Sequence, residues 1–166
     1  MHILVKKAQK GDPESFVQLI ESCKNSMYKV ARGYFNCEDD VADAMAETVA
    51  LAWEHLGELK KAEYFKTWLI RILINTCNRM VRNRKKCEVT ELVPELQYLD
   101  NRFSDVEFRE MLSSFPEDCR MILLLYYGEQ FHTREIAEIL GMKENTVKSK
   151  LRRTRGTLRE SILCSF

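Results

Sequence analysis

The sequence predicts an all-α protein with two small helical domains joined by an acidic linker, the second being a helix-turn-helix domain. Three observations predict this fold class. Apolar residues recur every three or four positions through most of the chain. No segment shows a convincing strand pattern. An acidic stretch with a proline, residues 87–101, interrupts the helical pattern. We expect domains over 1–86 and 104–166, with the linker over 87–103.

The first domain is predicted to contain three long helices. Asp12 and Pro13 suit the N-cap and the first position of a helix, and Gly33 and Asn36 mark its end. A second helix is expected from about Glu38–Asp40 to Gly57, and a third from about Tyr64 to Lys86. The apolar stripe predicted to be buried in the second helix is Val41, Ala44, Met45, Thr48, Val49, Ala52, Trp53 and Leu56.

Four shorter helices are predicted in the second domain: Asp105–Ser113, Pro116–Tyr127, Thr133–Leu140 and Asn145–Ile162. The last two, separated by a turn at Gly141, have the pattern of a helix-turn-helix. Thr133 can cap the first of them, and Gly141 can take the left-handed conformation of a tight turn. The face predicted to be buried in the last helix is Val147, Leu151, Thr154, Leu158 and Ile162.

The composition excludes several classes of protein. The 166 residues are 45% hydrophobic and 31% charged, with a formal net charge of +1, which is typical of a globular protein. The longest apolar run is Met121–Tyr127, far short of the roughly 20 residues of a membrane span, and the N-terminus lacks a signal-peptide pattern. We therefore expect a cytoplasmic protein.

Cysteine and histidine spacings give no support to a metal site. The six cysteines contain no C-x-x-C pair, and the three histidines lie far apart in the sequence. We expect reduced thiols, mostly buried, and no cofactor.

The near-zero net charge hides strongly charged blocks. Residues 36–58 carry seven acidic and no basic side chains, and residues 59–86 carry nine basic and one acidic. Residues 87–119 are again acidic, whereas 142–166 carry seven basic and two acidic side chains. Two basic blocks separated by acidic ones suggest two contacts with a polyanion.

The last helix divides its residues as a recognition helix does, with early residues toward base edges and later cations toward phosphates. Arg152 can contact guanine with two hydrogen bonds. The candidates for DNA contact are Glu144, Asn145, Thr146, Lys148, Ser149, Arg152, Arg153, Arg155 and Arg159.

The third helix combines basic and aromatic residues, a pattern suited to single-stranded nucleic acid. Phe65 and Trp68 fall on the apolar stripe and are expected in the core, whereas Tyr64 is more open. The polar face is Arg71, Asn75, Asn78, Arg79 and Arg82.

The second helix is acidic, and Asp43 and Glu47 share one face because they are four residues apart. A metal-dependent nucleic-acid enzyme could use Asp39, Asp43 and Glu47, but no constellation of His, Ser or Lys accompanies them and the sequence has no glycine-rich phosphate loop. A docking face for a basic protein partner is favoured. Its candidate residues are Asp39, Asp40, Asp43 and Glu47.

Three stretches together resemble bacterial RNA polymerase sigma factors of the extracytoplasmic-function group, over about residues 8–162. Asp43–Trp53 is similar to the core-polymerase-binding helix of that family, and Phe65–Thr76 to its promoter-melting helix. Phe115–Arg155 is similar to its −35 element domain. The resemblance implies a promoter-specificity subunit without catalytic activity, and an anti-sigma partner that is often anchored in the membrane.

The resemblance also implies residue roles. Asp43 and Glu47 would face the β′ clamp helices of core polymerase. The loop Gly57–Glu63, with Lys60, Lys61 and the following Tyr64, would capture an unstacked base of the −10 element. The linker would thread toward the RNA exit path. The residues that would hold the melted strand or its duplex edge are Arg71, Asn75, Asn78, Arg79 and Arg82.

Three positions depart from the family pattern. Ala46 replaces a usual glutamine, Lys143 a frequent Ser cap, and Asn145 a common glycine beside the DNA. With Lys143 in place of the cap, the last helix is expected to begin at Asn145. The main alternative to a sigma factor is a free-standing helix-turn-helix regulator, which would bind duplex DNA tightly without polymerase.

Overall fold

The computed structural model describes residues 1–87 and 115–164, and it describes side chains within 1–84 and 115–157. The chain divides into two compact units, Met1–Pro94 and Glu95–Phe166. Both units are helical in their described parts, which confirms the predicted fold class. The predicted linker 87–103 and the predicted helix Asp105–Ser113 lie largely or wholly outside the described residues, so the domain boundaries stay predictions.

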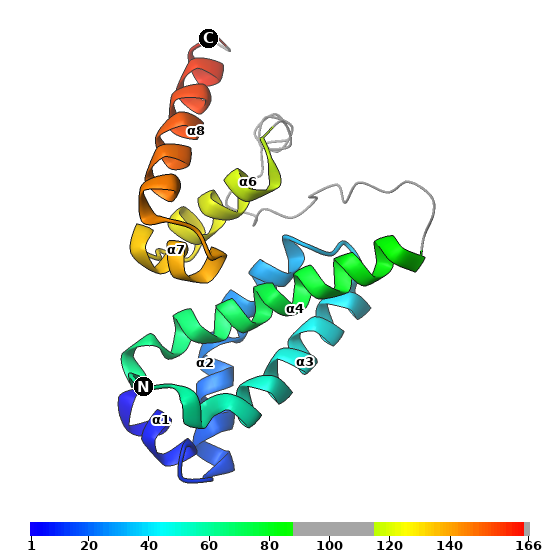
Figure 1. Ribbon diagram of the computed structural model, residues 1–166, viewed down its shortest axis with the longest axis vertical. Helices are drawn as coiled ribbons and strands as arrows, with labels where there is room; N and C mark the ends of the chain where they lie inside the picture. Colours follow the sequence, from blue (N-terminus) through cyan, green and yellow to red (C-terminus); the bar gives the residue numbers. More distant parts are fainter. Residues whose placement is uncertain (88–114, 165–166) are drawn as a thin grey trace. The chain divides into compact units, whose positions relative to one another are not determined.

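The described part of unit 1, residues 1–87, contains four α-helices and two short 3-10 turns (Figure 1). The helix α2 begins after Asp12, whose carboxylate accepts hydrogen bonds from the Glu14 amide (3.3 Å) and the Ser15 hydroxyl (2.5 Å). Hydrogen bonding by Ser15 lowers the pKa of Asp12. The elements are α1 (His2–Ala8), α2 (Pro13–Arg32), α3 (Glu38–His55), η1 (Leu56–Glu58), η2 (Ala62–Tyr64) and α4 (Phe65–Cys87).

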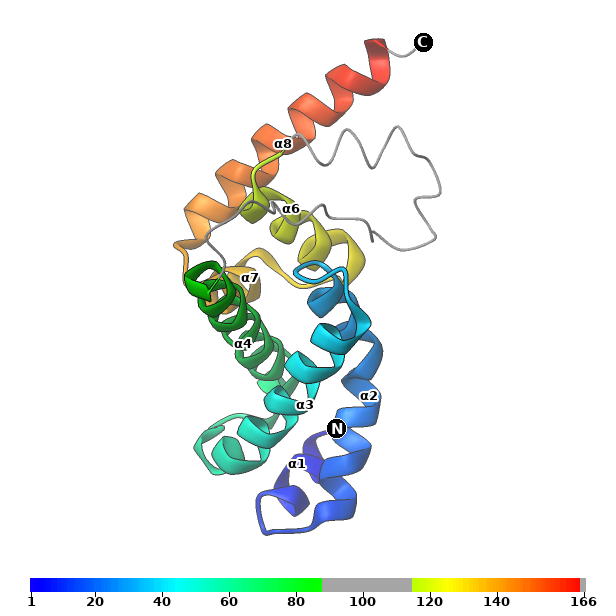
Figure 2. The same cartoon turned by 90° about the vertical axis from the view of Figure 1, so that its right-hand side faces the viewer.

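The core of unit 1 lies where α2, α3 and α4 pack against one another (Figure 2). Phe65, Leu69 and Leu73 of α4 are fully buried, as are Leu19 of α2 and Val41 of α3. Such burial stabilises the unit through the hydrophobic effect, because the apolar stripes that the sequence predicts face one another.

The arginine Arg32 joins the end of α2 to the start of α3. Its Nη1 donates a hydrogen bond to the carbonyl oxygen of Asn36 (2.7 Å) and forms an ion pair with Glu38 (3.2 Å). Glu38 also accepts a hydrogen bond from the Tyr28 hydroxyl (2.9 Å). These contacts fix the short connection between the two helices.

Two features of unit 1 differ from the predictions. Trp53 was predicted in the buried stripe of α3, but its side chain is 42% exposed and its ring lies against Phe16, with centroids 4.9 Å apart. The helix α1, seven residues long, was not predicted, because a segment of two turns is too short to show helical periodicity. It packs on α2 through Val5 and Ala8.

Unit 2 contains a helix-turn-helix. Gly141 has the left-handed conformation (φ 65°, ψ 31°) that the sequence predicts at the turn. Among the described residues of the unit, its fully buried core includes Ile122, Leu125, Ile136 and Val147. The described elements are α6 (Glu117–Leu123), the π-helical turn η3 (Leu124–Gly128), α7 (Thr133–Leu140) and α8 (Glu144–Cys164).

Three features of unit 2 differ from the predictions. The expected single helix Pro116–Tyr127 changes to π geometry at Leu124, where the Glu129 amide donates to the Leu124 carbonyl oxygen (3.1 Å). Thr133 does not cap α7, because its hydroxyl donates to Glu144 (3.0 Å) while His132 occupies the N-cap position. The helix α8 begins at Glu144, one residue before the predicted start.

The four cysteines with described side chains are free thiols. Cys23 and Cys77 are buried, Cys119 is half-buried and Cys37 is exposed. Burial raises the pKa of Cys77 to about 12, so its thiol stays protonated at neutral pH. In the described parts of the chain, no helix is suited to spanning a lipid bilayer.

Candidate nucleic-acid interfaces

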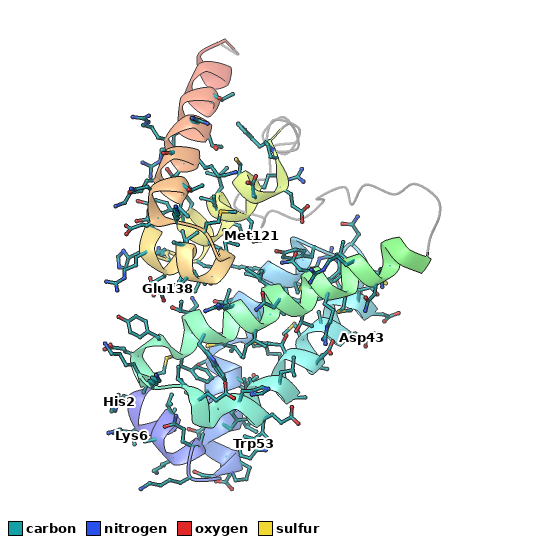
Figure 3. The ribbon with its side chains drawn as sticks, viewed as in Figure 1. His2, Lys6, Asp43, Trp53, Met121 and Glu138 are labelled. Carbon is teal, nitrogen blue, oxygen red and sulfur yellow. The ribbon has the colours of Figure 1, made fainter. Side chains whose placement is uncertain are left out.

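The four acidic candidates on α3 separate into two pairs. Asp40 and Glu47, seven residues apart, face α4 and form ion pairs with Arg84 and Arg79. Asp39 and Asp43 are exposed and have no ion pair among the described residues (Asp43 is labelled in Figure 3). The structure therefore brings only part of the predicted docking set to a free surface.

Arg84 was not among the predicted contact residues. Its guanidinium pairs with Asp40, whose side chain is only 13% exposed, and lies 5.6 Å from the ring centroid of Phe35. Its place in the basic block 59–86 was visible in the sequence, but its partner, 44 residues earlier, was not.

The polar face of α4 is exposed as predicted. Arg71, Asn75, Asn78 and Arg82 follow one another at intervals of four, three and four residues, which places them on one stripe of the helix. The Arg82 Nε donates to the carbonyl oxygen of Asn78 (3.2 Å), and Arg79 is turned toward Glu47. This stripe offers cations and amides to a nucleic-acid strand.

The loop between α3 and α4 presents its charged residues outward. Leu56, Leu59 and Ala62 are buried, whereas Lys60 and Lys61 are exposed. Tyr64, 39% exposed, has the Lys61 ammonium 5.7 Å from its ring centroid. An aromatic face beside a cation is suited to stacking an unpaired base.

The loop is held by Gln9, a residue that the sequence did not single out. Its side-chain Nε2 donates hydrogen bonds to the carbonyl oxygens of Leu56 (3.0 Å) and Leu59 (2.9 Å). Gln9 lies at the C-terminal end of α1, so the unpredicted helix supports the predicted loop.

The recognition helix α8 presents its predicted contact residues to solvent. Glu144 is half-buried, and the side chain of Arg159 lies outside the described residues. Val147, Leu151 and Thr154 are buried on the opposite face, as predicted. The exposed candidates are Asn145, Thr146, Lys148, Ser149, Arg152, Arg153 and Arg155.

Glu144 links the two helices of the motif. It accepts a hydrogen bond from Thr133 of α7 (3.0 Å) and pairs with Lys148 (2.8 Å). The hydrogen bond from Lys148, followed by that from Thr133, lowers the pKa of Glu144. Two predicted base contacts therefore bind each other when DNA is absent.

Arg155 lies against two tyrosines of η3. Its guanidinium carbon is 5.1 Å from the Tyr126 centroid and 5.4 Å from the Tyr127 centroid, and its Nε donates to the Tyr127 hydroxyl (2.5 Å). Hydrogen bonding by Tyr126, and then by Tyr127, raises the pKa of the guanidinium. These contacts orient a predicted phosphate contact.

An ion pair between Asp118 of α6 and Lys150 connects the recognition helix to α6. Burial has the largest single effect and raises the pKa of Asp118, but the hydrogen bond and charge of Lys150, together with hydrogen bonds from Cys119, outweigh it, so that the pKa is lowered. Lys150 is thereby held toward the protein rather than toward a ligand.

Within the described residues, no group of three or more His, Cys, Asp or Glu is placed to hold a metal ion. Asp39, Asp43 and Glu47, the carboxylates of the metal-dependent alternative, therefore do not form such a group.

Comparison with known proteins identifies a family match in each of the two units. Residues 19–87 match the family "Sigma-70 region 2", and residues 105–158 match "Sigma-70, region 4". RNA polymerase sigma factor SigV of Bacillus subtilis (strain 168) is 29% identical over 141 residues, 82% of this chain and 84% of the relative. ECF RNA polymerase sigma factor SigW of the same strain is 24% identical over 177 residues, 95% of this chain and 94% of the relative.

A solved structure shares the fold. The sigma factor RpoE of Bartonella quintana, crystallised with the anti-sigma factor NepR, matches with a TM-score of 0.70 and 24% identity over 89% of this chain and 96% of that one. The chain belongs to the sigma-70 family of RNA polymerase sigma factors. Within that family it is an extracytoplasmic-function sigma factor, which directs core RNA polymerase to promoters.

Proposed function

We propose that unit 1 docks on core polymerase and holds the −10 element, while unit 2 reads the −35 element. The observation that carries this proposal is that each unit exposes a helix face rich in cations and uncharged polar side chains, on α4 and on α8. The protein then contributes binding energy for promoter melting and no catalysis of its own.

For docking, the free carboxylates Asp39 and Asp43 are the primary contacts with the basic β′ clamp helices. Asp40 and Glu47 lie beside them but are paired with arginines of α4. Ala46, at the position where the family resemblance implies a glutamine, is exposed on the same helix and offers no polar contact.

For the −10 element, Tyr64 and Lys61 would receive an unstacked base. The stripe Arg71, Asn75, Asn78 and Arg82 would hold the strand on either side of it. Lys60 and Arg79 would add cations at the margins of this path.

For the −35 element, the N-terminal half of α8 would enter the major groove. Asn145, Lys148, Ser149 and Arg152 would approach base edges, with Glu144 and Thr146 beside them. Arg153 and Arg155 would contact phosphates.

Run-off transcription tests the proposal. Purified core polymerase, with and without this protein, is given a pool of promoter fragments at fixed salt, because phosphate contacts make binding salt-dependent. The expected result is new transcripts that start downstream of one shared −35/−10 pattern. No new transcripts, together with a tight shift of duplex DNA by the protein alone, would identify a free-standing regulator.

Reversal of charge at Asp43 tests the docking face. Asp43→Arg should weaken association with core polymerase by about tenfold, roughly 1.4 kcal/mol, because it places a cation toward a basic partner. Glu21→Arg, on the exposed side of α2, is the matched control and should leave the affinity unchanged. Equal affinities for Asp43→Arg and the unchanged protein would remove Asp43 from the interface.

We also propose that the protein acts in the cytoplasm and that an anti-sigma protein, anchored in the membrane or free, inhibits it. The complex of RpoE with NepR supports this partner class. Adding a purified candidate anti-sigma protein to the run-off reaction should abolish the new transcripts, and excess sigma factor should restore them. Transcripts that persist at saturating amounts would exclude that candidate.

A further inference from the structure

The hydrogen bonds of Gln9 converge on one short segment. The two donors are the two hydrogens of a single amide, and the two acceptors are the carbonyl oxygens of Leu56 and Leu59, 3.0 and 2.9 Å away. The Leu59 amide in turn donates to the Leu56 carbonyl oxygen (3.2 Å). One side chain therefore closes a turn of the loop onto the end of α1.

The segment held in this way directs the exposed residues after it. Leu59 is buried and extended (φ −70°, ψ 103°), and Lys61 is also extended (φ −126°, ψ 113°). The buried Ala62 then starts η2. Because both ends of Leu59–Ala62 are anchored, the positions of Lys60 and Lys61 depend on where the Leu59 backbone is held.

The packing of the helix α1 fixes the position of Gln9. Val5 and Ala8 are buried against the rest of unit 1, and α1 packs on both α2 and η2. Its other side faces solvent, as His2 and Lys6 show in Figure 3. Gln9 itself is exposed apart from its amide contact, so replacing it removes little core packing.

We propose that Gln9 is a positioning residue for recognition of the −10 element. It acts through the loop and does not touch DNA. This inference rests on the proposed function of the loop. Its consequence is that α1, far in sequence from the DNA-binding residues, controls how sharply unit 1 distinguishes bases at the −10 element.

Amide hydrogen exchange in the free protein tests whether the two hydrogen bonds of Gln9 hold the loop. Gln9→Glu has the same shape but cannot donate to the two carbonyl oxygens. Exchange over residues 56–64 should accelerate by roughly tenfold, since two hydrogen bonds are lost. Gln9→Lys, which restores donors at a similar reach, should slow it again. Gln18→Glu is the same substitution at an exposed position of α2 and should have no effect.

Forked promoter DNA tests the functional role. The ratio of holoenzyme affinities for a matched and a mismatched −10 base should fall by about fivefold or more in Gln9→Glu. Core affinity and −35 preference should stay unchanged. A preserved ratio, or an equal loss for all DNA sequences together with a lowered melting temperature, would overturn the proposal.

A second variant separates this inference from the proposed function. If Tyr64→Ala lowers the ratio of affinities for matched and mismatched −10 bases and Gln9→Glu does not, the loop reads the base and the role proposed for Gln9 is wrong. If neither variant changes the ratio, the loop is not the −10 reader, and the inference fails together with that part of the proposed function.

Discussion

The basic faces of α4 and α8 differ in how the protein treats their cations when no nucleic acid is bound. On α4, Arg79 and Arg84 pair with Glu47 and Asp40 from the neighbouring helix. On α8, Arg152 has no ion pair among the described residues, and Arg155 lies against tyrosines rather than carboxylates. Arg152 and Arg155 therefore have no carboxylate partner among the described residues, although Lys148 and Lys150 of the same helix pair with Glu144 and Asp118. The arginines Arg79 and Arg84 of α4, in contrast, are neutralised by the neighbouring helix.

This difference follows from the order of charge in the sequence. The acidic block 36–58 and the basic block 59–86 form adjacent helices of one unit, so that their charges meet. A polymerase surface that attracts the carboxylates of α3 would compete with the arginines of α4 for them. An exposed pair such as Glu47–Arg79 contributes little to stability, about 0–1 kcal/mol, and is easily exchanged.

The largest effect is expected at Arg152 of α8, which has no ion pair among the described residues. Arg152→Ala should cost about 1–3 kcal/mol in binding of holoenzyme to duplex −35 DNA and relax the preference at one position. Affinities for a set of single-base −35 variants measure this. Arg134→Ala, which replaces an exposed arginine of α7 that is not among the proposed contacts, is the control. Equal weakening for all of the −35 DNA sequences would mean that Arg152 contacts a phosphate and not a base.

An intermediate effect is expected where the cations are paired. The double variant Asp40→Asn, Glu47→Gln should tighten binding of the free protein to single-stranded DNA by roughly three- to tenfold at low salt. Two released cations should also steepen the slope of log K against log salt by about 1.4. Fluorescence titrations over a range of salt concentrations measure both quantities.

The control for this prediction removes the same charge from the same helix. Asp39→Asn with Asp43→Asn leaves both arginine pairs intact, so its salt slope should stay close to that of the unchanged protein. If the two double variants behave alike, overall charge rather than release of Arg79 and Arg84 governs the affinity.

The smallest effect is expected at the tyrosines. Tyr127→Phe keeps the ring beside Arg155 but removes the hydroxyl that accepts its Nε hydrogen bond. Binding to duplex −35 DNA should weaken by about two- to fivefold and equally for all sequences, because a phosphate contact is loosened. Tyr28→Phe in unit 1 removes a comparable hydroxyl, and any similar loss there would contradict a specific role.

Sequence patterns predicted the elements more successfully than their contacts. The capping pattern at Asp12 and Pro13 located the start of α2, and Thr133–Leu140 matches α7 at both ends. The exposed faces of α4 and α8 also follow from periodicity, since it reports which side of a helix is apolar. It does not report which helices meet.

For that reason, the contacts that join distant segments were not predictable. The pair Asp40–Arg84 spans 44 residues, and the contacts of Gln9 span 47 and 50. Trp53 follows the apolar stripe in the sequence, yet the end of α3 leaves it partly exposed. The roles proposed for individual residues toward polymerase and DNA stay predictions.

The π-helical turn η3 has a consequence for how relatives can differ in length. Loss of one residue from Leu124–Gly128 would allow a regular α-helix, and each residue omitted from a helix rotates the rest of that helix by about 100°. Tyr126 and Tyr127 would then no longer both face Arg155. In an alignment of relatives, gaps at this turn should therefore coincide with changes at Arg155. The evolution of the contacts between Arg155 and the two tyrosines would then be visible in insertions and deletions more than in substitutions.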